Sequence, residues 1–99
     1  MTQIKIYVVH ENNYNLDGLK YQLCEIFGGL TKYPNLKGLW INTNNATLVC
    51  DIVTVWEIWT NKTIEQINVT SLKAICQSIK QITKQDSQLY TINNDSFFI

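Results

Sequence analysis

At 99 residues the chain has the length of one domain, and 45% hydrophobic residues with zero net charge exclude a disordered chain. No apolar run approaches the roughly 20 residues of a membrane-spanning helix. All eight basic residues are lysine and they form no cluster, so the positive patch and guanidinium groups of nucleic-acid-binding proteins are missing. We therefore expect one domain over residues 1–99 that binds neither nucleic acid nor membrane.

The first elements expected in the chain are a strand and a helix. Residues 3–10 are rich in β-branched side chains that alternate between two faces, which predicts a strand. Residues 16–27 place Leu and Ile side chains at helical spacing, which predicts a helix. Gly28-Gly29 follows directly and is expected to end that helix, because glycine adopts left-handed backbone without a Cβ clash.

A loop and a long β-hairpin are expected next. Residues 31–37 contain Pro34, and because proline is excluded from central strands this segment is predicted to be a loop. Residues 38–42 form a short predicted strand, and residues 47–60, rich in Val, Ile and Trp, form a long one. The Asn-rich residues 42–46 between them are typical of a turn, so the two strands are expected to pair as a hairpin.

The last third of the chain begins with Thr63-Ile-Glu-Gln66, a pattern typical of a helix capping box. Apolar residues then recur at helical spacing and predict one helix over 63–84, which the β-branched pair Val69-Thr70 could interrupt early. Residues 88–92 form a last predicted strand, and Phe97-Phe98-Ile99 form an apolar tail.

The predicted order of elements is therefore β-α-β-β-α-β. A four-stranded antiparallel sheet with both helices on one face satisfies the connection rules, so the sequence predicts a ferredoxin-like α+β fold. Two helices cover only one face of the sheet, yet both faces of the strand 47–60 carry large apolar groups, with Val53, Val55 and Trp59 on one of them. We expect the uncovered face to be an interface and the protein to be a homo-oligomer. The alternative is that Phe97-Phe98-Ile99 folds over that face.

The cysteines indicate the compartment. Cys24, Cys50 and Cys76 are widely spaced and there is one histidine, so we expect no metal site and no cofactor. The odd number of cysteines and the lack of a signal-peptide pattern are typical of free thiols in a reducing compartment, so we expect a cytoplasmic protein. Cys24 and Cys76 fall within helical patterns and are expected to be buried.

Three residues are candidate acid or base groups. His10 ends the first predicted strand, but no nucleophile is identifiable nearby, so a solvated strand end is the alternative. Asp51 and Glu57 share one face of the long strand, yet six residues separate them by about 20 Å, so they cannot act as a carboxylate pair within one chain. Glu57 beside Trp59 needs a partner or water in an apolar sheet. The alternative is that its charge deters aggregation between sheets.

Three stretches of the chain resemble a group of small uncharacterised proteins of bacteria, phages and plasmids. The stretches are Phe27-Gly-Gly-Leu-Thr31, then Gly38-Leu-Trp40, then Asp51-Ile-Val-Thr-Val-Trp-Glu-Ile-Trp-Thr60. The resemblance implies a compact α+β domain of mobile-element origin, and it implies no particular activity. On the shared pattern Thr31, Trp40 and Asp51 are the positions of interest, although this chain has Asp51 where Glu is common in the group.

Residues and resemblance together give Thr31, Trp40, Asp51 and Glu57 as the candidate ligand-binding residues. Trp40 offers a flat apolar surface, and the carboxylates accept hydrogen bonds from the amines or ribose hydroxyls of a nucleotide. No catalytic residue is assigned, and the expected function is a non-enzymatic binding protein. It would be a phage or mobile-element accessory or anti-defence factor, in the host cytoplasm if phage-encoded, that sequesters a small nucleotide-like ligand or blocks a host protein. The alternative is a small dimeric enzyme with an acid or base site in a cavity between protomers.

Overall fold

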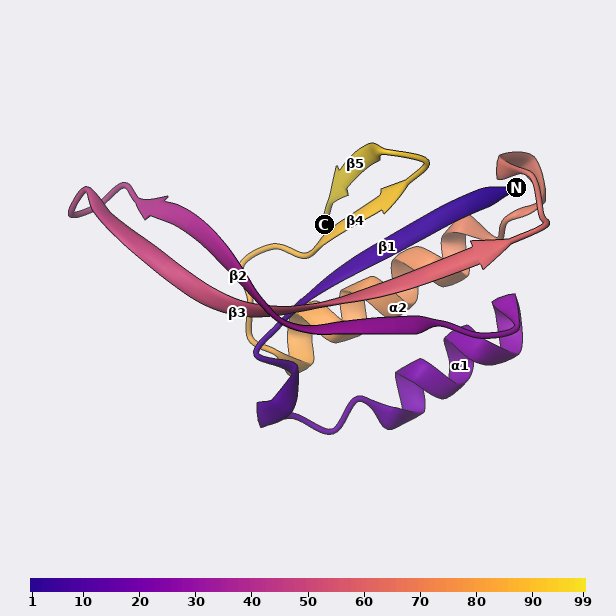
Figure 1. The fold of residues 1–99 in the computed structure, drawn as a ribbon, viewed down its shortest axis with the longest axis horizontal. Coiled ribbons are helices and arrows are strands. Elements are labelled where there is room, and N and C mark those ends of the chain that lie inside the picture. The colour runs from indigo at the N-terminus through magenta and orange to yellow at the C-terminus, as the bar shows by residue number, and fades with distance from the viewer.

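The computed structural model describes residues 1–99, and its five strands form one antiparallel sheet in the order β2-β3-β1-β4-β5. Helices α1 and α2 lie on the same side of this sheet (Figure 1), so the α+β class is confirmed. The elements in chain order are β1 (Thr2–Val9), the 3-10 turn η1 (Glu11–Asn13), α1 (Asp17–Phe27), β2 (Thr31–Asn42), β3 (Thr47–Thr60), the 3-10 turn η2 (Ile64–Gln66), α2 (Val69–Ile82), β4 (Leu89–Ile92) and β5 (Asp95–Phe98).

The expectation of a four-stranded ferredoxin-like sheet is wrong in the number of strands. Asn93 and Asn94 have φ angles of 48° and 72°, so they form a turn that reverses the chain directly after β4. Phe97 then stacks on Tyr90 with ring centroids 5.2 Å apart. The C-terminal residues therefore add β5 to the edge of the sheet and do not fold over its open face.

The loop predicted for residues 31–37 is the first half of β2. Pro34 is tolerated because β2 is an edge strand, where a missing N–H removes no hydrogen bond to a second neighbour. The pairing register with β3 shifts between Tyr33 and Leu36, and Asn35 has a φ angle of 60°. The pairing with β3 is therefore interrupted only around Pro34 and Asn35, and β2 continues on both sides of this irregularity.

The single helix predicted over 63–84 is divided in two. The capping box of Thr63 and Gln66 is confirmed, but it opens only the short η2. The Asn68 side chain accepts a hydrogen bond from the Ser71 backbone N–H at 3.0 Å and so begins α2. The other predicted elements, the strand 3–10, the helix 16–27, the hairpin around 42–46 and the strand 88–92, are confirmed with shifts at their ends.

The core lies between the helices and one face of the sheet. Along β1 buried residues alternate with half-buried ones, so Ile4, Ile6 and Val8 face the helices. Trp56 and Ile58 of β3 are fully buried on the same face. The opposite side of the sheet, called the open face below, carries the odd-numbered residues of β1 and β3.

The three cysteines are free thiols with different environments. Cys76 is buried as predicted, whereas Cys24 is only half-buried and Cys50 is exposed. Neither helix of the structure is long and apolar enough to cross a membrane.

The β2–β3 hairpin projects beyond the rest of the sheet. β1 pairs with β3 only from Val53 to Thr60, so residues 37–42 and 47–52 form a two-stranded arm without a third strand. Figure 1 shows this arm reaching away from the helices. Because the arm begins where β1 ends, its open-face residues border the end of β1.

Candidate functional site

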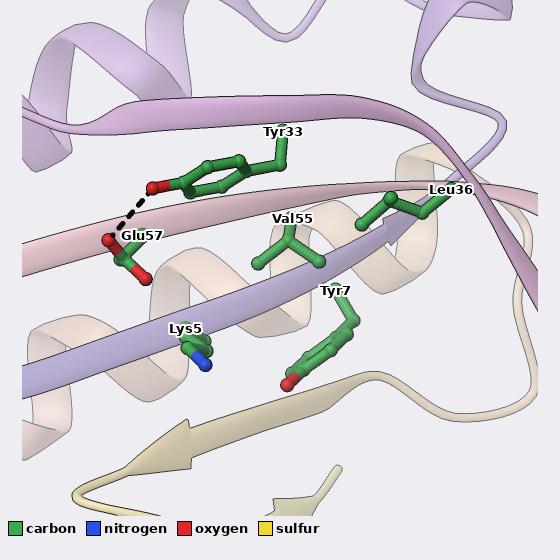
Figure 2. Close-up of a pocket in the computed structure, with 6 residues that line it drawn as sticks. All are labelled: Lys5, Tyr7, Tyr33, Leu36, Val55 and Glu57. Carbon is green, nitrogen blue, oxygen red and sulfur yellow. Dashed lines mark hydrogen bonds between the residues drawn. The ribbon is translucent and has the colours of Figure 1, made fainter.

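Two adjoining hollows lie on the open face and share Tyr7. The smaller hollow has a volume of about 380 Å³ and is shown in Figure 2. Its lining comes from β1, β2 and β3, with Lys5, Tyr7, Tyr33, Leu36, Val55 and Glu57. The larger hollow has a volume of about 640 Å³ and lies between the arm, the end of β1, the α2–β4 loop and the last strands. Both volumes fall in the range of small-molecule sites.

Glu57 is the central polar group of the smaller hollow. Its Oε1 accepts hydrogen bonds from the Tyr33 hydroxyl at 3.2 Å and from Trp59 Nε1 at 3.0 Å. Its Oε2 accepts one from Gln3 Nε2 at 3.1 Å. The negative charge of Glu57, its hydrogen bond and some desolvation raise the pKa of Tyr33, so the phenol stays protonated and donates. The carboxylate is therefore held in place by donors from three strands.

Lys5 gives the smaller hollow a positive charge beside the negative one. It stands directly opposite Glu57 in the β1–β3 register, and both side chains reach into the hollow in Figure 2. The rings of Tyr7 and Tyr33 supply apolar walls near these two charges. The hollow can therefore accommodate a ligand that carries both signs of charge and an apolar portion.

Asp51 is the central polar group of the larger hollow. Its Oδ2 accepts a hydrogen bond from Trp40 Nε1 at 2.8 Å, and its Oδ1 lies 3.3 Å from His10 Nε2. Trp40 is 48% exposed, so much of its indole ring is available to a ligand. Asp86 of the α2–β4 loop adds a second carboxylate to the lining, which contains no lysine.

The structure places the four predicted ligand residues in two pairs. Thr31 stands directly opposite Glu57 in the β2–β3 register, although it lines neither hollow. Trp40 contacts Asp51 through its indole N–H. Six residues of extended strand, about 20 Å, separate the two carboxylates, as the sequence indicated. The two pairs lie on one face and border neighbouring hollows.

Sequence reasoning did not identify several residues of these hollows. Lys5 was not among the expected ligand residues, yet its alternation with Ile4 and Ile6 was a usable signal, because polar residues between buried ones face the opposite side. The contact of His10 with Asp51 depends on a left-handed turn at His10 that no local pattern predicted. The structure contains no group of three or more His, Cys, Asp or Glu side chains that could hold a metal ion.

The chain is similar to known proteins in its three-dimensional structure, and no match was found from its sequence. No protein-family model and no curated protein matches the sequence, so the Phe-Gly-Gly-x-Thr pattern is not confirmed as a family motif. A solved structure of phage SAM lyase in complex with S-methyl-5'-thioadenosine is similar with a TM-score of 0.70 at 14% identity, over 99% of this chain and 88% of that one. Phage SAM lyase in its apo state gives a TM-score of 0.61 at 14% identity, over 99% and 87%. The chain shares the fold of these structures.

This likeness corrects the expectation of a non-enzymatic binding protein, because both similar structures are of enzymes. The bound molecule in one of them, S-methyl-5'-thioadenosine, belongs to the nucleotide-like class that was expected as a ligand. The phage source of both agrees with the phage or mobile-element origin that the resemblance implied. The comparisons favour the alternative expectation of an enzyme over that of a binding protein.

Proposed function

We propose that the chain is a small enzyme that cleaves S-adenosylmethionine (SAM) to S-methyl-5'-thioadenosine on the open face of its sheet. The observation that carries the proposal is the whole-chain similarity to phage SAM lyase, with a TM-score of 0.70 to the S-methyl-5'-thioadenosine complex. The hollows of the open face support it independently, since their chemistry suits the parts of SAM.

The smaller hollow suits the amino-acid end of SAM. That end carries an ammonium and a carboxylate, and the hollow offers Glu57 and Lys5 side by side. The adjacent sulfonium is a cation with apolar substituents, and cations bind over the faces of aromatic rings such as those of Tyr7 and Tyr33. Glu57 is already held by three hydrogen bonds, so little side-chain entropy is lost when it binds the ligand.

The larger hollow suits the adenosine. Trp40 offers a half-exposed indole on which a base can stack. Each oxygen of Asp51 has one protein partner and keeps a second lone pair that can accept from a ribose hydroxyl. Thr31, Trp40, Asp51 and Glu57 thus remain the proposed ligand-binding residues, with Thr31 at the outer edge beside Glu57.

The proposed reaction breaks the bond between sulfur and the amino-acid carbon of SAM without adding water. The electron pair of that bond passes to sulfur, so the sulfonium becomes a neutral thioether. The carbon receives a new pair from the substrate's own carboxylate, which gives a lactone, or from a neighbouring C–H bond, which gives an alkene and needs a base. The hollows contribute by binding the substrate and by orienting the reacting groups.

The site is proposed to be closed by a second copy of the chain. Both hollows open to solvent on a face whose large apolar groups include Trp59, 54% exposed, and Phe98, 69% exposed. Covering that face with another protomer buries these groups and excludes water from the ligand. A homo-oligomer with the ligand between protomers follows from this arrangement.

A biological role follows from the proposed chemistry. Consumption of SAM in a host cytoplasm removes the methyl donor on which methylation-dependent defence relies. We therefore propose that the chain is a phage or mobile-element anti-defence factor that acts through catalysis.

The test is to incubate the purified protein with SAM and to identify the products by mass spectrometry. We expect S-methyl-5'-thioadenosine together with a second product. Homoserine lactone would show that the substrate carboxylate attacks the carbon, whereas an amino acid with a carbon–carbon double bond would show that a C–H bond is broken. Glu57→Gln removes the charge but keeps an acceptor, and should lower kcat/KM about 30-fold or more. Glu65→Gln, an exposed carboxylate in η2, is the matched control and should leave turnover unchanged. Intact SAM after prolonged incubation would refute the proposal.

A further inference from the structure

His10 has an unusual backbone conformation for its position. Its φ and ψ angles are 54° and 41°, in the left-handed region, where a residue with a Cβ atom is disfavoured. Three of the five other residues with positive φ and a side chain are asparagines, and asparagine and histidine both tolerate this region better than most residues. The His10 N–H donates to the Ile52 carbonyl at 2.9 Å, so the turn remains tied to β3. Side-chain contacts next to His10 add to this backbone tie.

Glu11, the next residue, is anchored by its side chain. It is only 5% exposed, and its Oε1 lies 3.0 Å from Trp56 Nε1 and 3.1 Å from Lys20 Nζ. Its Oε2 lies 3.2 Å from Lys32 Nζ, without a well-aligned hydrogen bond. The three partners come from β3, α1 and β2, so one carboxylate joins three elements.

The charge of Glu11 is part of this arrangement. Burial alone would raise the pKa of Glu11, but the close contacts and positive charges of Lys20 and Lys32 outweigh this effect and lower the pKa. Lys20 also lies over the Trp56 ring, 5.8 Å from its centroid. A buried carboxylate is expensive unless it is paired, and an apolar side chain could fill the same volume. Unlike an apolar side chain, the Glu11 carboxylate makes polar contacts with three elements, and these contacts fix the position of the first residue of η1.

The two neighbours point to opposite sides of the sheet. Glu11 contacts Trp56 on the helix side, whereas His10 Nε2 reaches Asp51 Oδ1 in the larger hollow of the open face. Continued alternation along β1 would place His10 on the helix side and Glu11 on the open face, so the left-handed turn at His10 reverses the two sides. We infer that Glu11 is a positioning residue, which locks this turn and so holds the His10 imidazole against Asp51.

The inference rests on the proposed function only for its kinetic readout. His10 is the single histidine of the chain, so its ring C–H signals in an NMR spectrum are identified without further assignment. Asp51→Asn should shift these signals in the wild-type background, because the two side chains are in contact. In the Glu11→Gln background the same substitution should move them far less.

Two control variants separate positioning from general loss of stability. Glu25→Gln removes an exposed carboxylate of α1, and Ile79→Val trims a core residue. Both should keep the full response of His10 to Asp51→Asn. If Glu11→Gln does not fold, Lys32→Gln takes its place, since Lys32 is the more exposed partner and its loss weakens the same anchor.

Turnover provides the second readout. Misplacement of a contact in the site by about 1 Å can lower activity about 100-fold, so Glu11→Gln should lower kcat/KM about 10- to 100-fold. Asp51→Asn should then lower kcat/KM by a smaller factor than it does in the wild-type background, because the contact with His10 is already disturbed. An undiminished His10 response in the Glu11→Gln background, or an equal loss in Ile79→Val, would overturn the inference. Absence of SAM turnover in the wild type would refute the proposed function and leave the NMR comparison to decide the role of Glu11.

Discussion

Replacement of Trp40 by alanine separates a ligand platform from a core residue, and Trp56→Ala is its matched control. Trp56 is fully buried, and truncation of such a residue costs about 3–5 kcal/mol. Trp40 is 48% exposed on the projecting arm, where truncation leaves no closed cavity and removes one exposed hydrogen bond to Asp51. We therefore expect Trp40→Ala to lower the free energy of unfolding by about 1 kcal/mol, which corresponds to a Tm shift of about 4–8 °C.

The effect of Trp40→Ala on ligand affinity should be larger than its effect on stability. Stacking of a base on an aromatic side chain is worth about 1–3 kcal/mol, so the Kd for S-methyl-5'-thioadenosine should rise about 5- to 150-fold. Thermal melts of both variants without ligand, followed by calorimetric titration of Trp40→Ala, give the two quantities. A loss of stability as large as that of Trp56→Ala would make Trp40 structural. Unchanged affinity would remove it from the site.

Burial raises the pKa of the Cys76 thiol to about 12, so it should react with a thiol reagent only after denaturation, whereas exposed Cys50 reacts in the native protein. Labelling of Cys76 in native protein would contradict its placement in the core. The pKa of Glu11 lies below its ordinary value of 4.5, so its stabilisation is present above that pH and is lost as the pH falls toward the folded-state pKa. Urea unfolding at pH 7 and pH 3 should show a smaller acid-side loss for Glu11→Gln than for wild type, and equal losses would argue against the ion pairs. Val55→Lys places a charge on the open face and should dissociate the proposed oligomer in light scattering, and a wild-type monomer at high concentration would rule that oligomer out.

The elements with strong local patterns could be predicted from the sequence. The run from 47 to 60 is β3 with the same bounds, because β-branched and aromatic residues favour an extended backbone wherever the strand lies. The glycine pair after Phe27 ends α1 as expected, and Gly28 has a φ angle of 97°. Such features depend on the residue and its immediate neighbours.

The errors came from tertiary context. Proline is excluded from central strands but not from edge strands. Whether the strand that contains Pro34 is central or at the edge depends on the order of strands in the sheet. The tail Phe97-Phe98-Ile99 became a strand because β4 offered a free edge and Tyr90 a stacking partner. Both outcomes depend on where distant segments lie, which periodicity does not report.

The candidate site could be predicted only in part, because some of its features are local to one strand and others depend on contacts between distant segments. The alternation along β3 places Asp51 and Glu57 on one face, and the sequence sufficed for that. The donors that hold Glu57, above all Tyr33, come from another strand, and the contact of His10 with Asp51 needs the left-handed turn. The similarity to SAM lyase was found from the fold, since the identity is 14% and no family model or curated protein matches the sequence.

Turnover of SAM labelled with ¹³C in its methyl group, followed by NMR in the intact reaction mixture, tests the central claim most directly. We expect the methyl signal to move from its sulfonium position to the thioether position of S-methyl-5'-thioadenosine and to appear in no other product. A methyl signal that stays at the sulfonium position, or that moves to a different acceptor, would contradict it.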